Sequence, residues 1–329
     1  MTRVSVYYRN LFSRGERGTG RQDQRGDRQG AGVNVRNVIV IGDVMLDVIV
    51  KPDVAIAATS DTPSRVRLSR GGAAANMAEV LARAGHHVTY VGACGDDLAA
   101  KHFEDILRSA GIDVALQRGA EATGVVVALV DADGQRAMMT DRGANSALGI
   151  SHVLQQLAQP FDHLHVSGYT LLDPRITDVG RGAVARAIAL GRTTSIDVSS
   201  VAPLIEMTPK AFMKAAVGVH TLFANEEEAL TLSESEDVTL AIHRLAHDFN
   251  EVVITGGDRG AWAHSNGIDH HVESQSDQVI DTTGAGDAST GAYLAVRLRD
   301  GSIDEALTAA MSAASVVVRG LGSRGQSRI

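Results

Sequence analysis

The sequence has one cysteine, Cys94, few aromatic residues and no excess of positive charge. A single cysteine excludes an intramolecular disulfide and a zinc site built from several cysteines. Aromatic residues make up 4% of the 329 residues, and the formal net charge is −8. Proteins that bind nucleic acid or a membrane surface through charge normally present a basic field. We therefore expect no nucleic-acid partner and no membrane partner.

Long hydrophobic runs and two common nucleotide-binding motifs are also missing. No apolar run reaches the roughly 18 residues of a transmembrane helix. There is no GxxxxGK[ST] phosphate loop, and no GxGxxG follows the first predicted strand, which ends at Gly42. The second absence disfavours a Rossmann dehydrogenase. The composition, 44% hydrophobic and 21% charged, is that of a folded soluble protein, and we expect a cytoplasmic one.

The first stretch of the chain, residues 1–32, differs in composition from the rest. It is rich in Arg, Gly, Gln and Asp and has almost no apolar periodicity, which predicts a disordered tail. No continuous apolar segment follows the first charges, so a secretory signal is not expected. A second hypothesis is that the native start lies near Val33. We assign no function to residues 1–36 and expect one catalytic domain over 37–329.

From Asn37 onward, strand-like and helix-like segments alternate. Strands are expected at 38–41, 87–91, 163–166, 194–197, 221–224 and 252–255, and helices at 73–84, 98–110, 178–190, 238–248 and 288–299. Such alternation predicts a mostly parallel sheet covered by helices on both faces. The expected fold is therefore a three-layer α/β/α domain.

One part of the chain interrupts the alternation. Two short strand-like runs, 124–131 and 135–140, flank Asp133-Gly134, a strong hairpin signal. Together with a segment near 50–68 they predict a small separate sheet. We expect this sheet to form a lid from about 50–70 and 115–145.

The most informative segment is Asp281-Thr282-Thr283-Gly284-Ala285-Gly286-Asp287, which precedes a helix-like run. The two glycines allow backbone N–H groups to approach an anion, and the helix N-terminus adds donors and positive potential. Asp287 would lie at the mouth of this phosphate cradle, where its carboxylate could accept a proton from a hydroxyl. The alternative role of Asp287 is a helix cap. The complete string favours catalysis.

This segment, with Gly71-Gly72-Ala73-Ala74-Ala75-Asn76 upstream, resembles the two signatures of the PfkB, or ribokinase-like, family of carbohydrate kinases. The resemblance extends from about Asn37 to about Arg319. It implies a ribokinase-like fold, ATP and Mg²⁺ as cofactors, and transfer of the γ-phosphoryl group to a hydroxyl, expected to be a primary one, of a small carbohydrate. Asp287 is then the catalytic base, and Gly284, Ala285 and Gly286 form the anion hole.

The resemblance also assigns a substrate side. Asp47 matches an acidic residue that binds substrate hydroxyls, which a carboxylate does with directional selectivity. Asp43 is a second candidate, with a turn or cap as its alternative role. Gly71 and Gly72 would let the backbone approach the sugar, and Asn76 would offer a donor and an acceptor. Met45 stands where ribokinase has a polar Asn, which argues against ribose as the substrate.

A nucleotide side is implied as well. Asn225-Glu226-Glu227-Glu228 resembles the family's N-x-x-E element, in which Asn225 and Glu228 organise Mg²⁺, mainly through water. The alternative is a solvated acidic helix start. Further ATP contacts are expected from the glycine turn after residue 254 and from the residue before the anion hole: Thr255, Gly257, Gly260 and Thr283. Asp281 is a candidate for K⁺.

The acceptor is less defined by the sequence. The two lid ranges contain no Phe, Tyr or Trp, which disfavours a nucleoside that would stack on an aromatic surface. Among several lid arginines, Arg142 could reach the site and pair with a sugar acid such as 2-keto-3-deoxygluconate. Its alternative is a lid salt bridge. Our first choice is a neutral pentose, hexose or ketose, with a sugar acid or nucleoside as alternatives.

Other chemistry-bearing residues are interpreted as structural. His163 and His165 would share one face of a strand without a third ligand, whereas His86-His87 and His270-His271 would point to opposite faces. Cys94 is expected to be a small buried hydrophobe. A non-enzymatic alternative is a nucleotide-binding sugar sensor, and the lid is a candidate homodimer interface.

Overall fold

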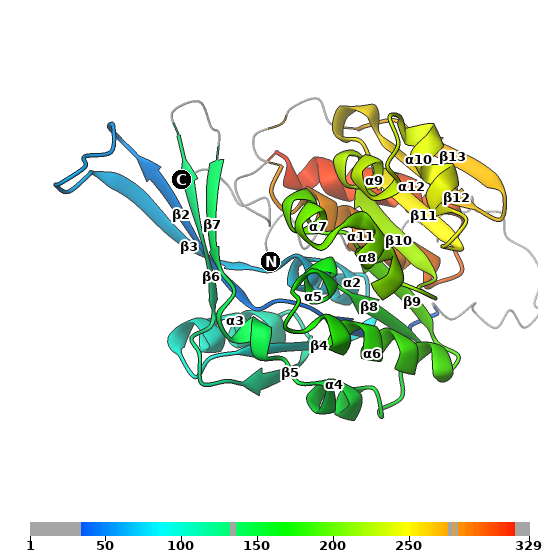
Figure 1. Ribbon diagram of the computed structural model, residues 1–329, viewed down its shortest axis with the longest axis horizontal. Coiled ribbons are helices and arrows are strands. Elements are labelled where there is room, and N and C mark those ends of the chain that lie inside the picture. Colours follow the sequence, from blue (N-terminus) through cyan, green and yellow to red (C-terminus); the bar gives the residue numbers. More distant parts are fainter. Residues whose placement is uncertain (1–33, 132–135, 276–278, 280–281, 320–329) are drawn as a thin grey trace, which may run out of the picture.

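The large sheet of the computed structural model has nine strands in the order β13-β12-β11-β10-β9-β8-β1-β4-β5 (Figure 1). The structure describes residues 34–131, 136–275, 279 and 282–319. The strands are β1 (Asn37–Ile41), β4 (His87–Cys94), β5 (Asp113–Arg118), β8 (His163–Val166), β9 (Thr193–Asp197), β10 (Thr221–Asn225), β11 (Glu251–Thr255), β12 (Ala261–Ser265) and β13 (Ile268–Val272). Neighbouring strands are parallel throughout β5-β4-β1-β8-β9-β10-β11. Strand β12 is antiparallel to β11, and β13 is antiparallel to β12. The predicted mostly parallel sheet is confirmed.

Helices cover both faces of this sheet. They are α2 (Ala73–Arg83), α3 (Leu98–Ser109), α4 (Ile150–Gln156), α5 (Gly168–Leu172), α6 (Thr177–Ala189), α7 (Val201–Met207), α8 (Pro209–Ala215), α9 (Glu226–Ser233), α10 (Val238–Leu245), α11 (Ala285–Arg297) and α12 (Ile303–Val317). Short 3₁₀ turns occur at Gly143–Ala147 and Gly257–Arg259. None of the helices in the described ranges is long and apolar enough to cross a bilayer.

Alternating side chains of the buried strand β1 divide the core into two halves. Ile39 and Ile41 pack into one cluster with residues of α4 and α6 to α10, whereas Val38 and Val40 pack with residues of α2, α3, α11 and α12. A strand that is apolar on both faces is typical of a parallel sheet between two helical layers. The sequence VIVI in β1 is the local cause of this arrangement.

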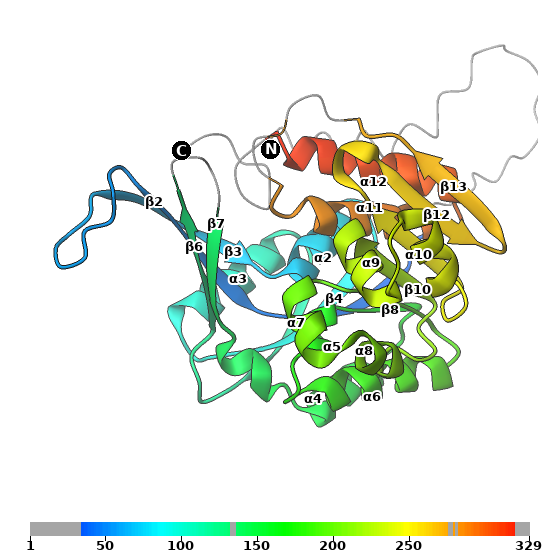
Figure 2. The same ribbon diagram turned by 45° about the horizontal axis from the view of Figure 1, so that its top comes forward.

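A second sheet of four strands, in the order β3-β2-β6-β7, projects away from the main body (Figures 1 and 2). Its strands are β2 (Met45–Pro52), β3 (Ser64–Gly71), β6 (Gly124–Val130) and β7 (Arg136–Asp141). We call it the lid sheet. It occupies much of the two ranges expected for a lid, but residues 115–118 belong to β5 of the large sheet. The predicted turn at Asp133-Gly134 lies outside the described residues.

Candidate active site

The segment around Asp287 forms the N-terminal end of α11. Gly284 precedes the helix with φ +78°, a conformation that L side chains rarely adopt, so glycine is required there. A Cβ atom built at Gly286 would meet open space, so this backbone is accessible. The amide of Ala285 donates to the carbonyl of Thr282 at 3.2 Å. The remaining donors of the first helical turn face no intrahelical acceptor and can bind an anion.

Asp287 lies in the first turn of α11 and meets the first turn of α2. Asn76 donates from Nδ2 to Oδ2 of Asp287 at 2.8 Å, across a separation of 211 residues. Burial raises the pKa of the Asp287 carboxyl to about 7, against the hydrogen bond from Asn76, and the charge of Asp197 raises it further. A carboxyl group with this pKa is suited to accept a proton near neutral pH.

Asn76 has a second feature that points to a ligand. The residue is 8% exposed, and its buried Oδ1 atom has no hydrogen-bond partner among the residues that the structure describes. Buried polar atoms are rarely left without a partner. The amide therefore presents one free acceptor beside the carboxyl group that it holds, which is suitable for a donating hydroxyl.

The base of the lid sheet brings two predicted substrate residues together. Met45 of β2 pairs with Gly71 of β3, and the Asp47 carboxylate lies so close to Gly71 that a Cβ atom there would collide with it. Burial raises the pKa of Asp47 to about 6, against the opposing charge of Arg70. Gly72, with φ +95°, lies against the Asp43 carbonyl and begins α2.

Arg142 and Asp43 form an ion pair. Arg142 donates from Nη2 to Asp43 at 2.9 Å and from Nε to Asp173 at 3.0 Å, and its guanidinium also lies over the Tyr169 ring. Burial raises the pKa of Asp43. The alternative role considered for Arg142, a salt bridge, is therefore present, with Asp43 and Asp173 as its partners. The positive charge of this arginine is compensated by carboxylates.

A pocket connects the N-terminal end of α11 with the carboxyl ends of β9, β10 and β11. Its lining residues are Ala73, Asp197, Ser199, Phe223, Ala224, Asn225, Glu228, Val253, Thr255, Gly286, Asp287, Ser289, Thr290 and Ala310. In parallel α/β sheets, ligands bind outside the carboxyl ends of the strands. The predicted residues Asn225, Glu228, Thr255, Gly286 and Asp287 thus share one pocket.

Asn225 and Glu228 form a capping box at the start of α9. The Asn225 side chain accepts from the Glu228 amide at 2.9 Å, and Glu228 accepts from the Asn225 amide at 2.9 Å. Glu228 is buried, and burial raises the pKa of its carboxyl to about 7. The helix-start interpretation and the pocket location therefore both apply, because Glu228 has a second carboxylate oxygen beyond the cap and the Asn225 Oδ1 atom has a second lone pair.

Asp197 was not identified from the sequence, although it lies where β9 ends in the pocket. His165 lies 3.2 Å from it through Nε2, and the other ring nitrogen is 2.9 Å from the Ser195 hydroxyl, which also contacts His163. Ser199 hydrogen-bonds Asp197 and has φ +72°, a strained backbone for a non-glycine residue. The position of Asp197 at a strand end was the available signal.

The remaining residues predicted on the nucleotide side are two glycines, Thr283 and Asp281. Gly257 is exposed with φ +62° and open space around it, whereas Gly260 is buried against the Val272 carbonyl, which gives it a packing role. Neither glycine lines the pocket that contains Thr255. Thr283 lies in the turn before α11, and Asp281, the K⁺ candidate, lies outside the described residues.

The structure gives contacts for several of the histidines and the burial of the cysteine considered in the sequence. His163 and His165 share Ser195 on one sheet face, and His270 and His271 have separate partners in Asp304 and the Arg259 carbonyl. Cys94 is buried. None of these residues belongs to a metal-like cluster in the part of the chain that the structure describes.

The carboxylate and amide oxygens of the pocket fit a hard divalent cation. Asp197, Glu228 and Asp287 supply carboxylates, and Asn225 supplies an amide oxygen. Mg²⁺ prefers such oxygen ligands and retains several waters. Burial is the main cause of the raised pKa values of Asp287 and Glu228, and the charge of Asp197 raises both pKa values further.

Comparison with known proteins identifies the class and the family. A catalytic pocket at the carboxyl edge of a parallel sheet, next to a glycine-rich helix start, defines an α/β phosphotransferase site. The model of the pfkB family carbohydrate kinases matches residues 35–328. The chain belongs to this family and is an ATP-dependent carbohydrate kinase.

Relatives with known names act on different acceptors. The chain is 29% identical over 292 residues to an ATP-dependent ribose-1-phosphate kinase of Halopiger xanaduensis, covering 87% of this chain and 93% of the relative. It is 27% identical to fructokinase-1 of Oryza sativa, covering 80% and 84%. The solved adenosine kinase of Sinorhizobium meliloti has a TM-score of 0.79 at 28% identity, covering 88% and 95%. The family is thus defined, whereas the acceptor is not.

Proposed function

We propose that this kinase transfers the γ-phosphoryl group of ATP to a hydroxyl group of a neutral sugar, with Asp287 as the general base. The observation that carries the proposal is the Asn76–Asp287 hydrogen bond, beside which the Asn76 Oδ1 atom has no partner within the described part of the chain. At this position Asp287 could accept the proton of the reacting hydroxyl, and the Asn76 Oδ1 atom could accept a hydrogen bond from a neighbouring hydroxyl of the same sugar. General-base assistance contributes about 10²–10⁴-fold to rate.

The substrate side of the proposal rests on charge. Asp47 lies against Gly71 and would accept hydrogen bonds from sugar hydroxyls, with Gly72 allowing close approach. Arg142 is already paired with Asp43 and Asp173. A sugar acid would need a cation that these carboxylates do not compensate, so the pairing supports a neutral pentose, hexose or ketose.

The nucleotide side is assigned to the pocket between α9 and α11. Asn225 and Glu228 would hold Mg²⁺ through water, with Thr255 and Thr283 near ATP and the Gly284–Gly286 backbone at the transferring phosphate. Bound Mg²⁺ supplies neutralisation of phosphate charge. A ribokinase-like protein of E. coli with the same fold, at 24% identity and a TM-score of 0.80, has been solved with ATP and Mg²⁺. The use of ATP supports a cytoplasmic location.

The lid sheet would close over the sugar and exclude water from the reaction. Residues 37–329 then act as one catalytic domain with a lid. Exposed apolar side chains of the lid sheet, among them Val66, Leu68 and Met138, support a homodimer formed through this sheet. K⁺ activation is a further part of the proposal, without a described ligand.

The test is coupled ADP release with Mg-ATP and a panel of acceptors, with and without K⁺. The panel should contain pentoses, hexoses, ketoses, ribose 1-phosphate, sugar acids and adenosine, with Asp287→Asn as the background. We expect a neutral sugar to raise ADP release and Asp287→Asn to remove the increase. Preference for a sugar acid or phosphate would contradict the role given to Arg142. Near-normal turnover by Asp287→Asn would reject the base.

A further inference from the structure

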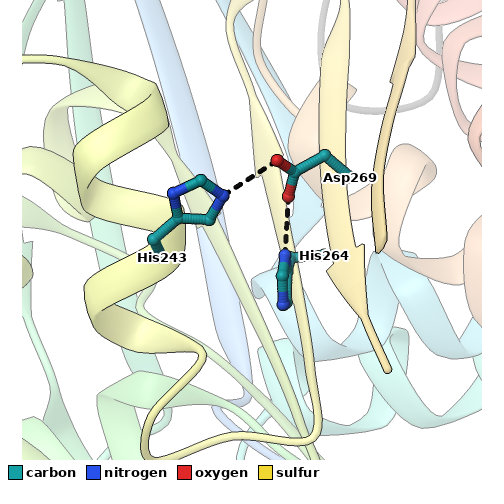
Figure 3. Close-up of side chains that lie close together, drawn as sticks. All are labelled: His243, His264 and Asp269. Atoms are coloured by element: carbon teal, nitrogen blue, oxygen red, sulfur yellow. Dashed lines mark hydrogen bonds and ion pairs between the residues drawn. The ribbon is translucent and has the colours of Figure 1, made fainter. Parts of the chain in front are cut away.

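A cluster of two histidines and one aspartate lies on the edge of the large sheet, away from the active site (Figure 3). His243 belongs to the last turn of α10, His264 to β12 and Asp269 to β13. One potential ligand atom from each residue lies within 4.8 Å of the other two. It is the one such cluster found among residues 34–131, 136–275, 279 and 282–319.

The two imidazole rings converge on the same carboxylate. His243 Nε2 lies 2.8 Å from Oδ2 of Asp269, and His264 Nδ1 lies 2.6 Å from Oδ1 (Figure 3). These hydrogen bonds lower the pKa of Asp269. The rings pack edge to face at 79°, with centroids 5.4 Å apart. Two nitrogens and one carboxylate therefore face a common point.

The backbone holds two of the three residues in place. Asn266 and Gly267 both have positive φ, at 52° and 76°, which is typical of a type I′ turn in a tight hairpin. This turn fixes the register in which His264 stands directly opposite Asp269. Cross-strand neighbours in such a hairpin have Cβ atoms about 5 Å apart. Helix α10 then adds His243 from the side.

The surroundings leave the cluster open to solvent. His243 and Asp269 are about half exposed, with side-chain exposures of 47% and 55%. A hollow lined by His247, Asn250, Asn266 and Gly267 reaches His264. The neighbouring Arg244 directs Nη1 to the carbonyls of Ser233 and Glu234, away from the cluster.

We propose that His243, His264 and Asp269 bind a divalent transition-metal ion of the zinc type, which ties α10 to the β12–β13 hairpin. Zn²⁺ is bound by His nitrogens and carboxylate oxygens at about 2.0–2.2 Å, commonly in tetrahedral geometry. Tetrahedral ligand atoms at that distance lie roughly 3.3 Å apart. The observed nitrogen–oxygen distances of 2.8 and 2.6 Å would need to open by roughly half an ångström or slightly more, and a water would complete the site. Mg²⁺ and Ca²⁺ prefer all-oxygen sites and are not expected here.

The site lies at the opposite end of the sheet from catalysis. In β11, Val252 is the partner of His264, whereas Thr255, which lines the active-site pocket, pairs with Ala261 at the other end of β12. The ion would therefore stabilise the hairpin and α10 without taking part in phosphoryl transfer. Ligands that bind only the folded state raise stability by mass action.

The test is Zn²⁺ binding to the full-length, metal-free protein without an affinity tag. Titration calorimetry in millimolar Mg²⁺, which occupies oxygen-rich sites, should give one equivalent of Zn²⁺ bound by wild type. Asp269→Asn and His243→Asn should weaken that equivalent by more than about 100-fold, beyond the range for outer-sphere partners. Zn²⁺ should raise the Tm of wild type by roughly 2 °C or more and leave that of Asp269→Asn unchanged.

The matched control is His270→Asn. His270 lies on β13, the strand that also carries Asp269. It contacts Asp304 at 2.8 Å and so forms a His–Asp pair like those of the cluster, but without a second imidazole on the same carboxylate. It should bind Zn²⁺ like wild type, and so should Asp287→Asn, which separates this site from the proposed catalytic one. Equal Zn²⁺ binding by wild type and Asp269→Asn, or no binding by wild type, would overturn the proposal. Circular dichroism of each metal-free variant verifies that it is folded.

Discussion

The chemistry of the site depends on the protonation states of a few carboxyl groups. Asp287, Glu228 and Asp47 all have raised pKa values, mainly because they are buried. The charge of Asp197 raises the pKa values of Asp287 and Glu228 further. A base with a pKa near the working pH can both accept and release a proton efficiently.

The pH dependence of turnover follows from the Asp287 pKa of about 7. Below this pH the carboxyl is protonated and cannot accept the hydroxyl proton, so kcat/KM should rise about tenfold per pH unit in the acid range and level off above about 7. Initial rates between pH 5 and 9 at subsaturating acceptor test this. A flat profile at fixed Mg-ATP occupancy would contradict Asp287 as the titrating base.

A second prediction concerns His165, which we regard as a positioning residue for Asp197. His165→Asn removes the 3.2 Å contact to Asp197. If Asp197 then moves away, a negative charge leaves the surroundings of Asp287, the Asp287 pKa falls, and the acid limb of the pH profile moves to lower pH. We also expect a lower kcat, by roughly 10-fold, at saturating Mg-ATP.

His163→Asn is the matched control for this experiment. His163 is buried on the same strand and shares Ser195, but it does not contact Asp197. It should lose stability without moving the acid limb. An equal shift of the acid limb in His165→Asn and His163→Asn would mean that the hydrogen-bonded residues His163, Ser195 and His165 act only through folding. Rescue by His165→Gln would support a positioning role for His165.

At the scale of elements, the lid sheet is anchored by a buried ion pair. Arg70, at the end of β3, is 1% exposed and donates to Glu79 of α2 at 2.8 Å, and Arg83 contacts the same carboxylate. The Arg70 guanidinium also lies 5.9 Å from the Phe103 ring of α3. Strand β3 and helices α2 and α3 therefore meet at the buried Arg70 guanidinium, and α2 is also the helix that carries Asn76.

Removal of one partner of this buried ion pair should lower the free energy of unfolding far more than removal of one partner of an exposed pair. Glu79→Ala leaves the buried Arg70 charge uncompensated, and we expect the free energy of unfolding to fall by about 3–5 kcal/mol. Asp105→Ala, which breaks the exposed Lys101 pair on α3, should change it by less than about 1 kcal/mol. Urea denaturation of both variants gives the comparison, and equal losses would contradict the anchor.

Secondary structure was largely predictable because its signals are local. The apolar runs at β1, β8 and β10 and the helices at α2, α3 and α6 agree with the expectations to within a few residues. α12 and the β12–β13 hairpin were not identified. α12 is rich in alanine and serine, small residues that give a weak apolar signal in the sequence.

The site was predictable where residues form contiguous motifs and not where the fold brings them together. Gly284, Asp287, Asn225 and Glu228 lie in such motifs. The partners of Arg142 are 99 and 31 residues away, so the sequence offered no means of choosing them. Asp197 and the His243–His264–Asp269 cluster depend on strand register and helix placement, which the chain order does not specify.

At the scale of the whole molecule, the lid sheet leaves apolar side chains in solvent. Val66 and Leu68 of β3 are 61% and 60% exposed, and Met138 of β7 is 57% exposed. Side chains two residues apart on a strand share a face. Exposed strand edges and apolar faces are normally covered by a partner.

We therefore expect the protein to be a dimer in solution and Leu68→Asp to convert it to a monomer with a higher KM for the acceptor. Light scattering coupled to gel filtration measures the mass, and acceptor titrations measure KM. Ile205→Asp, at a 61% exposed position on α7, is the control and should change neither. A monomeric wild-type protein, or a dimer unaffected by Leu68→Asp, would contradict the interface.

The Asn76–Asp287 hydrogen bond has a consequence for biosynthesis. During translation β1, β4 and β5 emerge first and can pair, while β8 must wait until residue 166 has been made before it joins the other edge of β1. Helix α11 emerges later, since Asp287 is made 211 residues after the asparagine that it meets. The Asn76–Asp287 contact, and with it the proposed catalytic base, therefore cannot assemble in a nascent chain before α11 has left the ribosome.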